Sequence, residues 1–215
     1  MIDLHTHTFL SDGELGPAEL VRRVEVAGFR AVALTDHVDN GTVEATVPVL
    51  VRAARELSAS APLRVLAGCE LTHCRPGDIK RLTDRARELG TDIVVCHGET
   101  IAEPVIPGTN RAAIEAGVDI LAHPGLLTEA DAAEAARQGV TLEISGRRGH
   151  CLTNGHVAAV ARRAGARVVF GSDMHAPSDL CDRAAAERVL RGAGLAVEEI
   201  VAALAEAERL AGLAV

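Results

Sequence analysis

The sequence predicts an α/β fold in which a parallel sheet closes, or nearly closes, into a barrel of seven strands. Three observations support this prediction. Short runs rich in Val, Ile and Leu alternate seven times with helix-patterned stretches rich in Ala, Glu and Arg. Glycine follows several of these stretches, where a helix is expected to end. Histidines and carboxylates fall at the ends of the apolar runs, and a barrel gathers such ends around one mouth.

The expected elements follow one another in a regular order. Strands are predicted at 2–7, 31–37, 64–71, 92–98, 119–124, 140–145 and 166–173. Helices are predicted at 17–28, 44–59, 78–89, 109–117, 129–138, 155–164, 182–192 and 197–211. Alternation of strand and helix is typical of a parallel sheet with its helices on the outside.

Individual residues mark where several helices begin and end. Pro17 follows Gly16 and suits the first position of a helix. Thr128 and Asp131 resemble a capping box, and Asn154 is expected to cap the helix at 155–164. Four glycines stand where a helix is expected to stop, namely Gly28, Gly90, Gly139 and Gly165.

Composition favours one domain over residues 1–215, because no linker or low-complexity tract divides the chain. Hydrophobic residues make up 48% of the sequence, which allows a sizeable core. A net charge of −8 and the absence of Trp and Tyr argue against binding to long nucleic acid, which needs basic surfaces and stacking platforms.

The cellular compartment is predicted from features that the sequence lacks. No run of about 18 apolar residues predicts a membrane span, and no signal peptide is apparent. The five cysteines show no CxxC pairing, so we expect reduced thiols in a cytoplasmic protein. Cys69 and Cys96 each precede a polar strand-end residue, and strand alternation predicts that both thiols are buried on the opposite face.

Polar residues at the strand ends predict a metal site. His5 and His7 are two positions apart on one strand, so both rings face the same side and can bind one ion. Further histidines and carboxylates occupy equivalent places, namely His37, Glu70, His97, His123, Asp173 and His175, with Asp12 in the loop after the first strand. Six histidines and three carboxylates would serve two or three ions such as Mn²⁺, Zn²⁺ or Fe²⁺. Three divalent ions would carry more positive charge than three carboxylates neutralise. The remaining positive charge would attract a hydroxide and a phosphate dianion.

These motifs resemble a known family. The segments "DLHTHTFLSDG", "ALTDH", "GCE", "CHG", "AHPG" and "GSDMH" are similar, in this order, to the motifs of the polymerase and histidinol phosphatase (PHP) family. The similarity runs from residue 3 to residue 175. It implies a distorted (β/α)7 TIM-like barrel with its metal site at the C-terminal rim of the strands. Many members hold three metal ions and hydrolyse phosphoesters.

The resemblance also implies a role for each motif residue. His5, His7, Glu70 and Asp173 would hold one ion, and Glu70 would bridge it to a second ion held by His97 and His123. Asp12, His37 and His175 would hold the third, and some members have a histidine at the position of Asp12. A hydroxide bridging two ions would attack phosphorus. Asp12, His37 and His175 are the candidate catalytic groups, because one of them would protonate the leaving oxygen.

Three further segments are expected near the mouth. "EISGRRGHCLTNGH" offers Arg147, Arg148 and His150 as substrate contacts, and because alternate residues point apart, at most one of the two arginines is expected to reach the substrate. His73 and Arg75 are expected at the rim. The long loop "GETIAEPVIPGTN" is expected to wall the pocket, with Glu99 orienting a ligand histidine and Glu103 nearby.

The leading functional prediction is a metal-dependent hydrolase of small phosphate monoesters, with histidinol phosphate as the named candidate. One alternative is a phosphoesterase acting on nucleotides or short oligonucleotides, and another is a non-catalytic regulatory domain that holds metal. Hydrolysis of C–N or C–O bonds on a lysine-bridged metal pair is disfavoured, because the sole lysine, Lys80, falls in a helix-patterned stretch. A further alternative is a homo-oligomer in which a second subunit completes the pocket.

Overall fold

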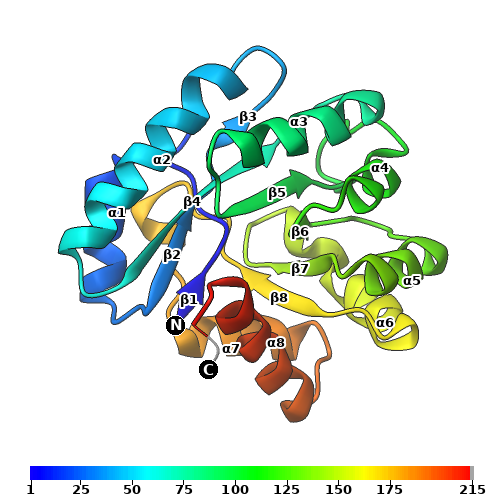
Figure 1. Cartoon of the computed structure of the whole chain (residues 1–215). Helices are drawn as coiled ribbons and strands as arrows, with labels where there is room; N and C mark the ends of the chain where they lie inside the picture. Colours follow the sequence, from blue (N-terminus) through cyan, green and yellow to red (C-terminus); the bar gives the residue numbers. More distant parts are fainter. Residues whose placement is uncertain (214–215) are drawn as a thin grey trace.

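The strands form one parallel sheet that curls into a barrel (Figure 1). The computed structural model describes residues 1–213. The strands are β1 (Ile2–Asp3), β2 (Ala31–Leu34), β3 (His37–Val38), β4 (Arg64–Leu71), β5 (Ile93–His97), β6 (Ile120–Ala122), β7 (Thr141–Ser145) and β8 (Val168–Gly171). Their order is β1-β2-β4-β5-β6-β7-β8, and β3 pairs with the C-terminal part of β4.

The first and last strands meet just beyond their ends, which nearly closes the barrel. Thr6 and Met174 form an isolated parallel bridge. The Asp173 N–H donates to the His5 carbonyl at 2.9 Å, and the His7 N–H donates to the Met174 carbonyl at 2.8 Å. The predicted nearly closed barrel is therefore confirmed, and its seam runs through the segments that carry the first and last histidine motifs.

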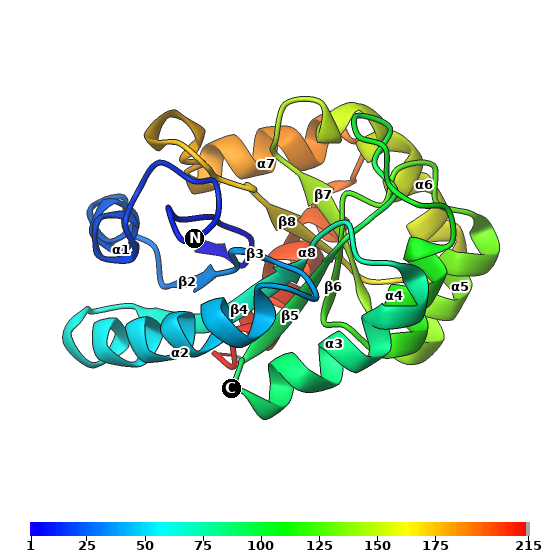
Figure 2. The ribbon, with the colours of Figure 1, turned by 90° about the horizontal axis from the view of Figure 1, so that it is seen from above.

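Helices cover the outside of the sheet, as Figure 2 shows from above. They are α1 (Pro17–Val26), α2 (Val43–Ser60), α3 (Pro76–Glu88), α4 (Thr109–Ala116), α5 (Glu129–Gln138), α6 (Asn154–Ala164), α7 (Arg183–Gly192) and α8 (Val197–Leu210). Two short 3₁₀ turns, η1 (His150–Thr153) and η2 (Pro177–Asp179), follow β7 and β8. The eight predicted helices are confirmed within two residues at each end.

Two apolar cores hold the barrel together. The larger lies between the sheet and the helices and includes Leu20, Leu50, Ile79 and Ile114, all fully buried. The smaller fills the barrel interior with Ile2, Leu66, Ile93, Ile120 and others, and it includes Ala207 and Ala211 at the end of α8. Because the inner core occupies the N-terminal half of the strands, the polar groups are confined to the opposite, C-terminal end.

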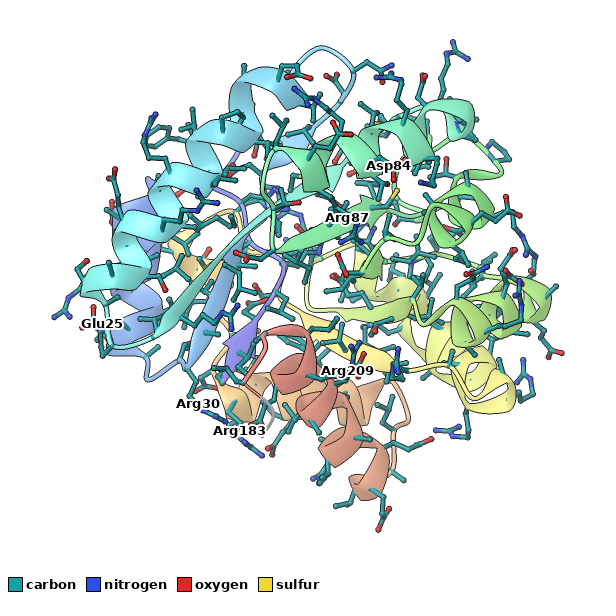
Figure 3. The ribbon with its side chains drawn as sticks, in the orientation of Figure 1. Glu25, Arg30, Asp84, Arg87, Arg183 and Arg209 are labelled. Atoms are coloured by element: carbon teal, nitrogen blue, oxygen red, sulfur yellow. The ribbon has the colours of Figure 1, made fainter. Side chains whose placement is uncertain are left out.

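The end of α8 is tied to the N-terminal ends of the strands. Arg30, which precedes β2, pairs with Glu208. Arg64 at the start of β4 donates from Nη1 to the Gly212 carbonyl at 3.3 Å. Charged side chains such as Arg30, Asp84 and Arg183 lie on the outside of the barrel (Figure 3). The closed base leaves the C-terminal rim as the open end of the barrel.

Some local predictions are corrected by the structure. The predicted strand 31–37 is divided into β2 and β3, because the carboxylate of Asp36 turns to accept the N–H and hydroxyl of Thr8. The predicted cap Asn154 is wrong, since Thr153 precedes the helix and has no capping hydrogen bond. The Asn154 amide instead bonds to the backbone N–H and C=O of Ser145.

Other local predictions are confirmed. Thr128 accepts the Asp131 N–H at 3.1 Å and donates its hydroxyl to the Asp131 carboxylate at 2.7 Å. The four glycines predicted to end helices all have positive φ angles. Cys69 and Cys96 are buried, and no disulfide joins any cysteines in residues 1–213. No helix in this part of the chain is long and apolar enough to cross a membrane.

Candidate metal centre

The nine predicted ligands converge at the C-terminal rim of the barrel. They come from the segments after β1, β6 and β8 and from β3, β4 and β5 themselves, and they enter the same space because the C-terminal ends of parallel strands lie together. A cavity of about 210 Å³ opens there and is lined by Asp12, His37, His97, His123, Asp173 and His175, among others. A second cavity of about 250 Å³ lies between α6 and α8, but alanines dominate its wall and no histidine lines it.

The deepest group contains His5, His7, Glu70 and Asp173. The His5 Nε2 atom lies 3.4 Å from Glu70 Oε1 and 3.8 Å from Asp173 Oδ1. The His7 Nε2 atom lies 3.7 Å from Glu70 Oε2 and 3.2 Å from Asp173 Oδ1. All four side chains are buried. Two imidazoles and two carboxylates that face one point are a donor set suited to a divalent transition metal.

The group predicted to share Glu70 is only partly assembled. The His123 Nε2 atom lies 3.6 Å from both Glu70 Oε1 and Asp173 Oδ2. The His97 Nε2 atom instead lies 3.1 Å from Glu103 Oε2. His150 stacks on His123 with ring centroids 4.1 Å apart, so it joins this group as a third histidine.

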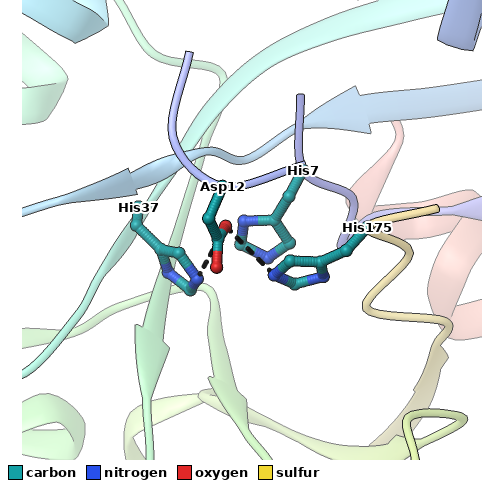
Figure 4. Close-up of side chains that lie close together, drawn as sticks. All are labelled: His7, Asp12, His37 and His175. Carbon is teal, nitrogen blue, oxygen red and sulfur yellow. Dashed lines mark ion pairs between the residues drawn. The ribbon is translucent and has the colours of Figure 1, made fainter. Parts of the chain in front are cut away.

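The third predicted group forms at the outer side of the cavity (Figure 4). The Asp12 Oδ1 atom lies 3.4 Å from His37 Nε2 and 3.2 Å from His175 Nε2. His7 adds its ring to this group, at 4.2 Å from the His37 centroid and 4.1 Å from that of His175. Asp12 is 57% exposed, which makes its carboxylate the most accessible part of the group.

Several buried polar atoms in these groups have no hydrogen-bond partner among the described residues. They are His5 Nε2, both ring nitrogens of His7, Glu70 Oε1 and His123 Nδ1, together with Glu143 Oε1 beside His5. An unsatisfied buried polar atom costs about 1–3 kcal/mol, so such a concentration is unfavourable in the apoprotein. Divalent cations would satisfy the lone pairs of the nitrogen and oxygen atoms that face the cavity. The residues present therefore fit a metal centre.

Unusual backbone φ angles also occur at the histidine-rich cavity. Three non-glycine residues in the described chain have a positive φ angle, namely His73 at 52°, His123 at 27° and Asp173 at 54°. Such conformations are strained for residues with a Cβ and concentrate at functional sites. Two of the three are predicted ligands, and the third, His73, lines the same cavity.

Proton affinities in the cluster are set by burial and by close charges. Burial lowers the pKa of His37, but the charge of Glu70 and the hydrogen bond to Asp12 outweigh it and raise the pKa to about 10. Burial raises the pKa of Asp173 to about 7, with the charge of Glu70 adding to it. Burial lowers the pKa of His7, and the neighbouring His37 lowers it further. Without a cation, the raised pKa of His37 favours a protonated ring, and a metal ion bound by this ring would replace the proton.

Sequence reasoning missed one contact inside the barrel. Glu143 on β7 lies 2.5 Å from His5 Nδ1 and is fully buried. This contact fixes the Nδ1 side of the ring and leaves Nε2 turned toward the cavity. The one charged residue of the predicted strand 140–145, a glutamate, was the signal available in the sequence.

The predicted substrate contacts are distributed over two adjoining cavities. Arg147 lines the histidine-rich cavity, where its Nη1 atom donates to the Asp173 carbonyl at 3.3 Å. Arg148 lines only a neighbouring cavity of about 480 Å³, which Arg147 also borders. His150 is buried, and its Nδ1 atom lies 2.8 Å from the Thr100 hydroxyl. Of the two arginines, Arg147 alone lines the histidine-rich cavity, and both lie in the loop that follows β7.

The loop after β5 differs from expectation in one residue. Glu99 accepts the backbone N–H groups of Gly108 and Asn110, so it braces the loop and contacts none of the predicted ligands. Glu103, in the loop expected to wall the pocket, lines the cavity and faces His73, His97 and His150. Arg75 precedes the first residue of α3, and His73 lines the cavity.

The chain is similar in sequence to several known proteins. The model of the PHP domain family matches residues 3–175. An uncharacterized protein of Methanocaldococcus jannaschii is 45% identical over 200 residues, which cover 92% of each chain. A protein of Shewanella halifaxensis named a probable phosphatase is 28% identical over 231 residues, covering 94% of this chain and 88% of the relative.

Solved structures with similar folds share little sequence with this chain. Histidinol phosphate phosphatase of Lactococcus lactis, crystallised with zinc, L-histidinol and phosphate, has a TM-score of 0.64 at 15% identity, covering 91% of this chain and 94% of its own. The putative histidinol phosphatase of Listeria monocytogenes has a TM-score of 0.60 at 13% identity, covering 84% and 97%. A structure described as an amidohydrolase has a TM-score of 0.65 at 14% identity, covering 99% and 74%.

Proposed function

The chain belongs to the PHP domain family, and from this premise we propose that it is a metal-dependent phosphatase that hydrolyses phosphate monoesters of small molecules. The observation that carries the proposal is the convergence of buried, unpaired nitrogen and oxygen atoms at the barrel mouth. The relative named a probable phosphatase and the fold shared with histidinol phosphate phosphatase support it. One domain over residues 1–215 and a cytoplasmic location, supported by the free thiols, are part of the proposal.

Two or three divalent ions are proposed for the site. His5, His7, Glu70 and Asp173 would hold one, Glu70 with His97 and His123 a second, and Asp12, His37 and His175 a third. Bound ions would lower the pKa of water, neutralise phosphoryl oxygens and stabilise the leaving oxygen. Zinc, manganese and iron all suit this mixture of imidazole and carboxylate donors.

The protein's own residues orient the substrate around these ions. Arg147 presents its guanidinium at the cavity wall beside Asp173, where it is placed to bind a phosphate oxygen. Asp12 stands on the exposed side with His37 and His175 as its partners. These three residues are the groups placed to hand a proton to a leaving oxygen. The buried walls formed by His5 and Glu143 exclude bulk water from the inner side.

One observation favours an alternative substrate class. The adjoining cavity of about 480 Å³ is lined by Arg148, Ser172 and Ser178 and shares Arg147 with the histidine-rich cavity. A leaving group that carries a second anionic group, as a nucleotide does, would gain a favourable contact there. Amidohydrolase-type chemistry on a bridging lysine has no such support, because Lys80 lies on α3, 63% exposed, and pairs with Asp84.

The test is phosphate release by Mn²⁺-loaded protein from a panel of compounds. The panel contains histidinol phosphate, sugar phosphates, mononucleotides, nucleoside bisphosphates and a short oligonucleotide, with Asp173→Ala as the control. Release from a small monoester that is absent in the control supports the proposal. Release only from the nucleotides, the nucleoside bisphosphates or the oligonucleotide supports the nucleotide alternative. No release by protein shown to carry its metals would favour a non-catalytic metal-holding domain.

A further inference from the structure

We propose that His73, His97 and Glu103 form an additional divalent-cation position at the outer edge of the cavity, beyond the three groups described above. One ligand atom from each of the three residues lies within 4.8 Å of the others. Neither His73 nor Glu103 is among the nine predicted ligands. The position is solvent-accessible, because the side chains of His73 and Glu103 are 47% and 38% exposed.

Glu103 is the centre of this arrangement. Its Oε2 atom lies 3.2 Å from His73 Nε2 and 3.1 Å from His97 Nε2. Its Oε1 atom lies 3.5 Å from His150 Nε2. Within residues 1–213 all the ion-pair contacts of Glu103 are with histidines, whereas carboxylates on the outer helices, such as Glu44 and Asp84, pair with arginine or lysine. When these imidazoles are neutral, the carboxylate has no fixed cation, which favours an exchangeable one.

The orientation of His97 points to the outer position. Its Nδ1 atom lies 3.1 Å from the Gly98 carbonyl. A carbonyl only accepts, so Nδ1 carries the proton and Nε2 keeps the lone pair that a metal needs. That Nε2 atom faces Glu103. His97 also lies near His123 and His150. An ion in the outer position would take His97 over from the second proposed ion, and His123 would remain beside Glu70 to hold that ion, with His150 close by.

The backbone of His73 gives an independent argument. Its φ of 52° places it with His123 and Asp173, the other two non-glycine residues of the described chain that have positive φ angles. Both of those are predicted ligands. A strained conformation is retained where the side chain must point in one direction. At His73 that direction is toward Glu103 and the cavity.

The experiment counts bound Mn²⁺ by equilibrium dialysis and elemental analysis, so it does not depend on the phosphatase proposal. Wild type is compared with the double variant His73→Asn, Glu103→Gln, which leaves His97 in place. The control is Glu44→Gln, which removes the same charge from an exposed glutamate that pairs with Arg85. We expect the double variant to bind one Mn²⁺ fewer per chain than wild type, and the control to bind as many as wild type.

Two results would overturn the proposal. Equal Mn²⁺ binding by wild type and the double variant would show that His73 and Glu103 hold no ion. Loss of two or more ions would place His73 and Glu103 within the inner groups, not in a separate position. A crystal grown with Mn²⁺ should show an anomalous peak between His73 Nε2 and Glu103 Oε2. Phosphate release by the same proteins tests the phosphatase proposal separately.

Discussion

At the scale of single residues, Glu143 supports a proposed metal ligand, His5, although it does not itself line the cavity. It contacts the Nδ1 atom of His5. The other ring nitrogen, Nε2, then points toward Glu70 and has no hydrogen-bond partner among residues 1–213. Burial would lower the pKa of His5, but the charges of Glu143, Asp173 and Glu70 outweigh burial and raise it. The carboxylate on β7 therefore sets both the orientation and the basicity of a proposed ligand.

The variant Glu143→Gln should weaken metal binding while preserving the fold. Glutamine keeps the size of the side chain but removes the charge, and loss of such a supporting group costs about 10- to 100-fold in metal affinity. Competition titration of Zn²⁺ against a chelator measures the change, and circular dichroism of the apoprotein checks the fold. Glu206→Gln, at another buried glutamate far from the cavity, is the matched control. Unchanged affinity in Glu143→Gln would refute this role.

At the scale of elements, the loops after the strands hold the ligands in place by close backbone contacts. Gly125 follows His123 and Pro124, with a φ of 64°. A Cβ built on Gly125 would lie 1.8 Å from the Glu99 carbonyl oxygen. Glu99 in turn accepts the N–H groups of Gly108 and Asn110. The β6–α5 loop and the β5–α4 loop therefore pack backbone against backbone beside the cavity, and only glycine allows this approach.

Gly125→Ala should destabilise the protein far more than Gly165→Ala. Both glycines have positive φ, which costs alanine about 1–2 kcal/mol. At Gly165 an added Cβ would meet no described atom within 4 Å, so only this cost applies. At Gly125 the clash with Glu99 adds about 1–3 kcal/mol of overpacking. Urea unfolding of the two variants measures the difference, and equal midpoints would contradict the close contact seen here.

The docking of α8 depends on a charged residue in a nearly buried place. Glu206 is 6% exposed and accepts the Thr141 hydroxyl on β7 at 2.6 Å. Arg209 and Arg167 approach the same carboxylate at 2.6 and 3.1 Å. Burial raises the pKa of Glu206, but the hydrogen bonds from Arg209 and Thr141 outweigh burial, and the net pKa is lowered. The ionised carboxylate therefore stabilises the folded state.

Glu206→Gln should lose about 1–3 kcal/mol of stability at neutral pH. A lowered folded-state pKa means that the stabilisation is complete above the ordinary value of 4.5 and is lost as the pH falls through the folded-state pKa. The difference between wild type and variant should thus be constant from pH 7 to about 5.5 and shrink under more acidic conditions. Urea unfolding across this range measures it. If the stability difference between wild type and variant grew on acidification, the ionised Glu206 carboxylate would not be the stabilising form.

At the scale of the whole molecule, the proposed metal ligands occupy a part of the barrel interior that apolar side chains would otherwise fill and stabilise. The N-terminal half of the barrel is filled with apolar side chains, whereas the C-terminal half buries histidines and carboxylates with unpaired atoms. Buried polar atoms without partners oppose folding, and ions that bind only the folded state offset this cost. The metal centre is therefore expected to be part of what holds the barrel mouth together.

Removal of metal should lower the unfolding temperature. A ligand present at 100 times its Kd stabilises the folded state by about 2.7 kcal/mol per site. For a chain of this length that corresponds to a shift of several degrees or more. Thermal unfolding is compared for Mn²⁺-loaded protein, protein treated with EDTA, and treated protein with Mn²⁺ restored. An unfolding temperature that is the same in all three samples would argue against buried metal at the mouth.

The sequence by itself determined the elements and where the polar residues fall along them. Apolar runs, helical periodicity, and local signals such as Gly139 and the Thr128–Asp131 pair depend on neighbours in the chain, and the structure confirms them. A parallel barrel then requires the strand ends to meet, which is why nine ligating side chains reach one mouth. Their binding of metal stays a prediction.

Only the tertiary structure decided which of these side chains face one another. Glu143 reaches His5 across 138 positions of sequence, and His97 turns to Glu103 where the sequence grouped it with Glu70. Arg147 lines the histidine-rich cavity, whereas Arg148 lines only the neighbouring one. Such pairings depend on the paths of the loops and the closure of the barrel seam. Local sequence patterns carry no information on either, because both are set by contacts between distant segments.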